Sequence, residues 1–391
     1  MLLSYTVNSV GDYVGLVALA VLVYRETRDP LATAALFVAA QFLPALVGPA
    51  LTARVDQLRL RRVLPALYLG EALAFALLAL LADAFSLPLV LLLAAGDGVL
   101  RITERALTRA ATHATLDPRG LLREGNALFN IAFAGASVGG AALGGLLVDR
   151  LGVATALLVD AASFAVIAVV LATARALPAT HAEREPLRAR LRAGLRHART
   201  DRIARVLLAG EGIAVMLFAL VVPVEIVYAQ ETLQTDEAGY GLLLAAWGAG
   251  IVVGSALYFV LRRRSAVALI LLSTLAVGAG YLGMAGTREL WVACAFSVVG
   301  GAGNGIQWVA VLTALQEATP ADLQARVTSL LESIGSAATG AGFLLGGVIA
   351  ALFSPPAAFA VSGVGVLVLV AAGALLFRAG RTTWRPESTA S

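Results

Sequence analysis

The chain has 391 residues, of which 59% are hydrophobic and only 14% are charged, and its formal net charge is +4. So few charged residues cannot cover the surface of a water-soluble fold of this size. The composition therefore indicates an integral membrane protein. All 29 basic residues are arginine, which excludes a P-loop ATPase and a retinal or pyridoxal Schiff base, because each of these needs a lysine.

In chain order, the sequence contains twelve apolar runs, each long enough to cross a bilayer, which takes roughly 20 residues. They are residues 1–24, 31–53, 63–85, 87–112, 126–148, 153–174, 204–228, 240–261, 267–286, 290–315, 327–353 and 357–377. The first run has no basic segment before it and no small-residue cleavage site after it, so we expect a spanning helix rather than a signal peptide. The sequence predicts an all-α membrane protein with twelve transmembrane helices.

The two halves of the chain repeat one pattern at a constant offset of 202 residues. The matching pairs are Pro118 and Pro320, Leu121 and Leu323, Arg62 and Arg264, Gly144 and Gly346, and Gly145 and Gly347. An offset of about half the chain length indicates two tandem copies of one unit. We therefore predict two six-helix bundles, residues 1–174 and 204–378, followed by a tail of residues 379–391, with a substrate site between the bundles at mid-membrane.

The arginines are shared unequally between two sets of connections. Those after the even-numbered runs hold most of them, and we count Arg105 and Arg109 in this set, whereas the alternate connections hold only Arg25, Arg28, Arg150 and Arg288. Positively charged loops stay in the cytoplasm. We therefore expect a multi-pass protein of the cell membrane with both termini in the cytoplasm.

The long connection, residues 175–203, joins the two copies. Leu187, Leu191 and Leu195 recur every four residues among arginines, a pattern typical of a basic amphipathic helix on an anionic membrane face. A nucleic-acid-binding patch would carry similar charge. We favour the membrane surface and expect no nucleic-acid partner, because a cytoplasmic connection must be positive in any case.

Several short motifs occur in a characteristic order along the whole chain. They are residues 9–12 with 22–24, Asp56 with Arg61 and Arg62, Pro118 and Leu121 with 126–128, residues 139–145 and 160–164, Pro223 with Tyr228, and Pro320, Leu323, Arg326 and Val327. In these residues the chain resembles the major facilitator superfamily, and within it the drug/proton antiporter branch with macrolide-efflux and enterobactin-exporter-like proteins. The resemblance implies a secondary transporter that works by alternating access.

The loop after the second run departs from the family pattern. The family has a glycine, three further residues and Asp-Arg, whereas this chain has Thr52 in place of the glycine and Gln57 after Asp56. The resemblance implies that Asp56, Arg61 and Arg62 form a gating loop that latches the halves in one facing state. The same arginines can instead serve as a positive-inside anchor. The family's fifth-helix motif also carries Gly-Pro, where this chain has Gly139-Gly140.

Glycines at intervals of about four residues mark two of the runs. They are Gly135, Gly139, Gly140, Gly144 and Gly145 in the first half, and Gly342 and Gly346 in the second. Small residues at this spacing allow helix backbones to approach closely in lipid. We predict that these glycines pack helices together, and a smooth seam of this kind would also let two bundles rock against each other.

Ionisable residues inside the runs are the candidates for proton coupling, since such residues are costly in a membrane and usually mark a pathway. The candidates are Asp12, Glu71, Asp97, Arg101 and Glu211, while Asp160 and Glu225 lie closer to the ends of their runs. Arg101 follows Asp97 by four residues, so the two can form an ion pair on one helical face. The alternative is a static ion pair or hydrogen bond that locks helices together.

Polar and aromatic residues at similar depth are the candidates for the substrate cavity: Gln41, Asn130, Asn304, Gln307 and Trp308. The amides can equally form hydrogen bonds between helices. Cys294 is the only cysteine and the three histidines are scattered, so we expect no metal, no cofactor and no enzymatic activity.

The sequence thus favours a monomeric transporter that couples protons to the efflux of an amphipathic small molecule such as a drug, macrolide or siderophore. An importer, an uncoupled facilitator and a non-transporting membrane sensor or scaffold remain as alternatives.

Overall fold

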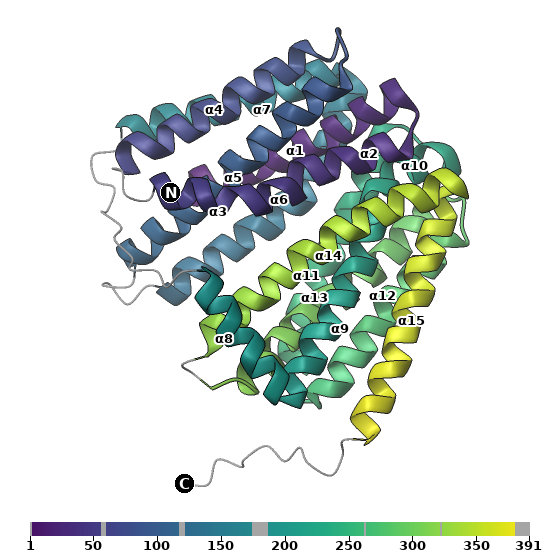
Figure 1. The fold of residues 1–391 in the computed structure, drawn as a ribbon. Helices are drawn as coiled ribbons and strands as arrows, with labels where there is room; N and C mark the ends of the chain where they lie inside the picture. Colours follow the sequence, from purple (N-terminus) through teal and green to yellow (C-terminus); the bar gives the residue numbers. More distant parts are fainter. Residues whose placement is uncertain are drawn as a thin grey trace.

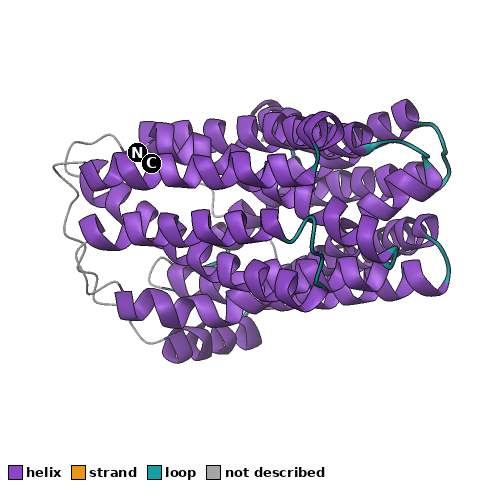
Figure 2. Ribbon diagram, turned by 90° about the horizontal axis from the view of Figure 1, so that it is seen from above, coloured by secondary structure: helices purple, strands orange, loops and turns teal. Residues whose placement is uncertain are grey.

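The computed structural model describes residues 2–55, 60–116, 122–173, 187–261, 263–320 and 323–379. Every regular element in these ranges is helical. The helices run side by side along one direction and are joined at their two ends (Figure 2). The expected all-α architecture is confirmed.

The first half of the chain forms six spans. They are α1 (Leu2–Thr27), a second span made of α2 (Pro30–Phe37), a π-helical turn (Val38–Phe42) and α3 (Leu43–Val55), then α4 (Leu60–Leu80), α5 (Leu87–Leu116), α6 (Leu122–Leu151) and α7 (Val153–Thr173). The connecting helix α8 (Leu187–Thr200) follows.

The second half repeats this arrangement. Its first span consists of α9 (Arg202–Val221), a 3₁₀ turn (Val222–Val224), α10 (Glu225–Val227) and a π-helical turn (Tyr228–Thr232), and it is followed by α11 (Glu237–Leu261), α12 (Ala266–Ala285), α13 (Leu290–Glu317), α14 (Gln324–Leu352) and α15 (Pro355–Ala379).

Eleven spans of the described chain are long and apolar enough to cross a membrane. The twelfth, α5, is 30 residues long but carries Asp97, Arg101, Glu104 and Arg105 in its middle, which lowers its hydropathy. With α5 included, the structure has the predicted twelve spans. A helix with so many charged groups is stable in a membrane only if its charged face packs inside the protein.

The helices form two groups, α1–α7 (purple to blue) and α9–α15 (teal to yellow), which meet along α6 and α11 and along α2 and α14 (Figure 1). Consecutive spans alternate in direction, so their connections lie on two faces. We call the face with connections 28–29, 152 and 233–236 the arginine-poor face, and the other the arginine-rich face. At the arginine-poor end of α6, a Cβ added to Gly145 would lie 2.8 Å from Cα of Gly241 in α11.

The other glycines differ in their surroundings. In α6, a Cβ at Gly140 or Gly144 would lie 2.9 Å from the nearest atoms of α1. In α14, a Cβ at Gly342 would lie 2.7 Å from the Ala219 side chain of α9, and Gly346 faces the backbone of Leu220 in the same helix. Gly135 and Gly139 depart from the prediction, because a Cβ there would meet no described atom within 4 Å.

The connecting helix α8 packs on α14, and the contact is close because of one glycine. A Cβ at Gly194 would lie 2.8 Å from the backbone oxygen of Arg326. Leu191 is half-buried, while Leu195 stays exposed next to the exposed Arg192 and Arg196. The apolar stripe of α8 is therefore shared between the protein and the surroundings.

Two alanine substitutions in spanning helices should change stability in opposite directions. In Gly346→Ala the new methyl group would meet the carbonyl carbon of Leu220 at 2.8 Å, and backbone cannot move aside as a side chain can. We expect a loss of about 1–3 kcal/mol, as for other overpacked sites. In Gly139→Ala the methyl group meets open space, and removing a helical glycine should stabilise by roughly 0.5–1 kcal/mol. Thermal unfolding of both purified variants in detergent tests this, and equal melting temperatures would contradict it.

Candidate functional site

A buried ion pair joins α1 to α5 in the first half of the chain. Asp12 of α1 is only 7% exposed, and its Oδ2 accepts a hydrogen bond of 2.6 Å from Nη2 of Arg105. Nη1 of Arg101, one turn earlier on the same face of α5, lies 3.8 Å from Oδ1 of Asp12. Two guanidinium groups therefore face one carboxylate.

The second span supplies a backbone acceptor to this cluster. The Ala40 carbonyl accepts a hydrogen bond of 3.0 Å from Nη2 of Arg101. In a regular helix this carbonyl would bond the N–H group four residues later, but that residue is Pro44, which has none. The proline and the π-helical turn around Ala40 thus leave the carbonyl free for the arginine. Gly98 of α5 faces Ala40 and Pro44 and makes room for this approach.

A cavity of about 290 Å³ opens beside the ion pair. It is lined by Asp12, Tyr13 and Leu16 of α1, Ala40 and Gln41 of the π-helical turn, Arg101, Ile102 and Arg105 of α5, and Phe133 of α6. The rings of Tyr13 and Phe133 are tilted, with centroids 6.2 Å apart. Charged groups and apolar or aromatic groups thus share one wall, and all of them belong to the first half.

Further carboxyl groups lie behind this wall. Tyr68 of α4 and Thr108 of α5 both donate hydrogen bonds to Oε1 of Glu104, the latter at 2.9 Å. Both carboxyl oxygens of Glu71 and Oδ1 of Asp97 are buried without a hydrogen-bond partner among the described residues. Burying an ionised carboxylate without a partner is costly, so these oxygens are unusual features of the first half.

Asp160 of α7 is also buried, although the sequence placed it near a helix end. Its carboxyl group occupies the space beside Gly11 and Gly15 of α1, where any Cβ would collide with it. Ser163 donates a hydrogen bond of 2.8 Å to the Asp160 carbonyl. The two glycines of α1 therefore make the position of this acid possible.

In the second half, Glu211 of α9 and Gln307 of α13 form a buried pair. Nε2 of Gln307 donates to Oε2 of Glu211 at 2.5 Å, and Oε1 of Gln307 has no partner among the described groups. Asn304 is half-buried and Trp308 is 47% exposed. Neither lines the cavity beside Asp12.

The structure thus brings together three of the predicted residues, Asp12, Gln41 and Arg101, at one cavity. The ion pair expected between Asp97 and Arg101 is not formed, because Arg101 reaches Asp12 and Ala40 instead. Arg105, which the sequence analysis counted with the connection, lies inside α5 and is corrected to a cavity residue. The sequence did contain a signal for this position, because Arg105 follows Arg101 by four residues and so lies on the same helical face. Glu104 and Tyr68 were missed.

The remaining predicted residues lie elsewhere. Arg61 and Arg62 are exposed at the start of α4. Asp56 and the side chain of Asn130 lie outside the part of the chain that the structure describes.

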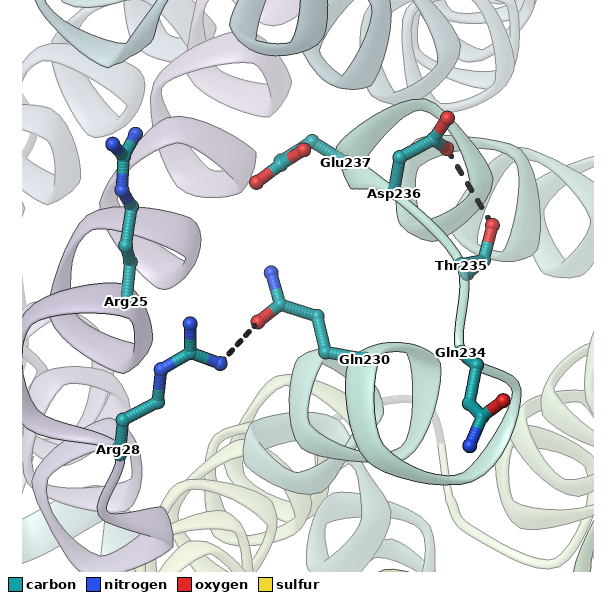
Figure 3. A pocket seen from close by; sticks show the side chains of 7 residues that line it. All are labelled: Arg25, Arg28, Gln230, Gln234, Thr235, Asp236 and Glu237. Atoms are coloured by element: carbon teal, nitrogen blue, oxygen red, sulfur yellow. Dashed lines mark hydrogen bonds between the residues drawn. The ribbon is translucent and has the colours of Figure 1, made fainter.

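A second, polar crevice of about 390 Å³ lies at the arginine-poor face, between α1 and the α10–α11 segment (Figure 3). Arg25 and Arg28 face Gln230 and Glu237 across it, and Nη1 of Arg28 donates to Oε1 of Gln230 at 3.4 Å. Next to it, Tyr24 donates a hydrogen bond to Glu231. These contacts tie the two halves together. Because the arginines here are exposed and screened by solvent, the buried cluster at Asp12 is the stronger candidate for a functional site.

Comparison with known proteins shows which class of protein this chain resembles. The model of a family described as transmembrane secretion effector matches residues 2–384. None of the curated proteins that were compared matches the chain.

Several solved transporters share the fold at low sequence identity. A mutant of the nucleoside transporter NupG has a TM-score of 0.77 at 12% identity, over 96% of this chain and 99% of that one. A bacterial homolog of the human lysosomal transporter Spinster, inward-facing and unoccupied, has 0.74 at 15%, over 98% of both chains. The human organic anion transporter MFSD10 has 0.61 at 18%, over 95% of this chain and 97% of that one.

The fold and these matches define a multi-pass membrane transporter of the major facilitator kind, and not an enzyme. Since the family match covers nearly the whole sequence, the chain belongs to the transmembrane secretion effector family.

A bulky residue at the seam of the two halves should favour opening of the arginine-poor face. In Gly241→Val, the side chain would lie within 2.8 Å of Cα of Gly145 and push α11 away from α6. We expect longer distances between spin labels on Leu151→Cys and Gln234→Cys, two exposed positions on opposite halves, in a Cys294→Ala background.

The matched control is Gly335→Val, because a Cβ at Gly335 meets no described atom within 4 Å. Distance distributions that are identical in the two valine variants would show that the glycine contact does not hold this face closed.

Proposed function

We propose that this chain exports an amphipathic small molecule across the cell membrane in exchange for protons, as a monomer that works by alternating access. The observation that carries the proposal is the buried Asp12 carboxylate, which two arginines hold at the wall of a cavity. A carboxylate in this position can exist in two states, ion-paired or protonated. Each state leaves a different set of contacts between α1 and α5.

Protonation is the change that can drive the transport cycle. A proton on Asp12 removes its negative charge and releases Arg105 from a hydrogen bond of 2.6 Å. Glu71 and Asp97 interact electrostatically with this cluster and are themselves buried, so they provide further places where a proton can reside. Glu211, held by Gln307, is the corresponding candidate in the second half.

We infer the orientation from the distribution of charge. With the arginine-rich connections in the cytoplasm, the closed contacts at Tyr24, Gly145 and Gly241 lie on the outer side. This arrangement suits a transporter that is ready to load substrate from the cytoplasm. The exposed arginines of α8 would then face the anionic inner leaflet.

The direction and substrate range rest on the family. Its description as a secretion effector favours export. The resemblance to the drug/proton antiporter branch favours drug-like, macrolide or siderophore substrates. An importer and an uncoupled facilitator of the same fold are distinguished from an exporter by the experiment below.

Neutralising the coupling carboxyl groups should separate proton-driven from downhill transport. We expect Asp12→Asn, Glu71→Gln or Asp97→Asn to abolish accumulation driven by a pH gradient in inverted vesicles, because the residue can no longer bind and release a proton. Downhill exchange of the same compound should persist. The measurement is uptake of a panel of lipophilic dyes and macrolides, with and without a protonophore.

The control is Asp83→Asn, which changes an exposed carboxylate in a connection of the arginine-poor face. Gradient-driven transport that survives in all three variants, or that ignores the protonophore in the unmutated chain, would refute proton coupling through these groups. Accumulation driven in the opposite sense would identify an importer.

A further inference from the structure

We infer that the cavity beside Asp12 takes a substrate with an anionic group, and that Arg105 and Arg101 are the residues that bind this group. The inference rests on the proposed function in one respect, namely that this cavity is the place where the substrate binds. It selects anionic amphiphiles from the broader range that the family allows.

The charge of the cavity wall is the first reason. The wall carries two guanidinium groups and a single carboxylate, so one formal positive charge is in excess. Among the described residues, Asp12 is the only acid within 4.0 Å of either arginine. The Arg101 side chain is 17% exposed, so an opposite charge beside it is screened less than it would be in bulk water.

The acids behind the wall do not balance this charge by contact. Facing the arginines from α4, α5 and α7 are Glu71, Asp97, Glu104 and Asp160, and none of them forms an ion pair with Arg101 or Arg105 within 4.0 Å. Each has at least one buried oxygen without a described partner. These acids therefore supply no ion-pair contact that would neutralise the second guanidinium group.

Free donors are the second reason. A guanidinium group has five N–H donors in a planar fork. The described hydrogen bond of the Arg105 side chain uses only Nη2, which donates to Asp12, and the side chain is 38% exposed. The fork geometry matches the two oxygens of a carboxylate or phosphate group.

The remaining residues of the cavity wall indicate the polarity of the rest of the substrate. Leu16, Ile102 and the tilted rings of Tyr13 and Phe133 offer apolar and aromatic contacts, and Gln41 offers one amide. A flat apolar body with an acidic end satisfies both parts of the wall. A cationic amphiphile would meet the excess positive charge, while its natural partner Asp12 is already occupied by Arg105.

A matched ligand series tests the charge preference directly. We would measure dissociation constants of the purified full chain in detergent for naphthylacetic acid, naphthylacetamide and naphthylethylamine by calorimetry. The acid should bind on the order of 10- to 100-fold tighter than the amide, as expected for hydrogen bonds to a charged group. The amine should bind most weakly.

Two substitutions should change acid binding in opposite directions. Arg105→Gln should abolish the preference for the acid over the amide. Asp12→Asn should tighten binding of the acid, on the order of tenfold, because it removes the competing negative charge. The triple variant Asp12→Asn/Arg101→Gln/Arg105→Gln leaves no formal charge on the wall and should show no preference, which covers the case that Arg105→Gln alone does not fold. Arg288→Gln, at an exposed position, is the control.

Equal binding of acid and amide by the unmutated chain, no binding of the acid, or weaker acid binding in Asp12→Asn would overturn the inference. The outcome is independent of proton coupling. Arginine-dependent acid binding together with transport that ignores the proton gradient would refute the proposed coupling alone. Proton-driven transport without acid preference would refute the anionic substrate alone.

Discussion

The ion pair between Asp12 and Arg105 links α1 to α5, the first and fourth spans of the first half. A charged group in a membrane must be paired or hydrated, and Asp12 is only 7% exposed, so removing its arginine partner would leave a buried, unpaired carboxylate. The pair therefore favours a rotation of α1 and α5 that turns Asp12 and Arg105 toward each other. Pro44 and the π-helical turn serve the other arginine. They leave the Ala40 carbonyl available to accept a hydrogen bond from Arg101.

The repeat gives this pair a counterpart in the second half. Arg105 and Gln307 occupy equivalent positions, since they differ by the repeat offset of 202, and each bonds an acid on the first helix of its half, Asp12 or Glu211. The difference lies in the charge of the donor. A guanidinium stabilises an ionised acid, whereas a neutral amide is compatible with a protonated one. The two halves thus carry chemically different donors, an arginine and a glutamine, at equivalent positions of the same architecture.

The sequence predicted the spans well, because hydrophobic runs of about 20 residues are dictated by bilayer thickness alone. It marked Asp12 and Arg101 as candidates because ionisable residues inside such runs are costly, and the structure places both at one cavity. It did not predict which acid pairs with Arg101, because spacing within one helix favours Asp97 while packing between helices brings Asp12 closer. Gly135 and Gly139 were indistinguishable in sequence from Gly144, because only the neighbouring helix decides whether a glycine is crowded.

The helix that deviates most from the apolar pattern is the one that carries the site. Eleven spans satisfy the hydropathy expected of membrane helices, and α5 does not, because Asp97, Arg101, Glu104 and Arg105 interrupt it. Lipid-facing positions cannot accept such residues, and Arg105, Arg101 and Glu104 find partners in α1, the π-helical turn of the second span and α4, as the contacts of Asp12, Ala40 and Tyr68 show. In a transporter built from nearly uniform apolar helices, the least apolar span is therefore the one whose polar groups depend most on partners inside the protein.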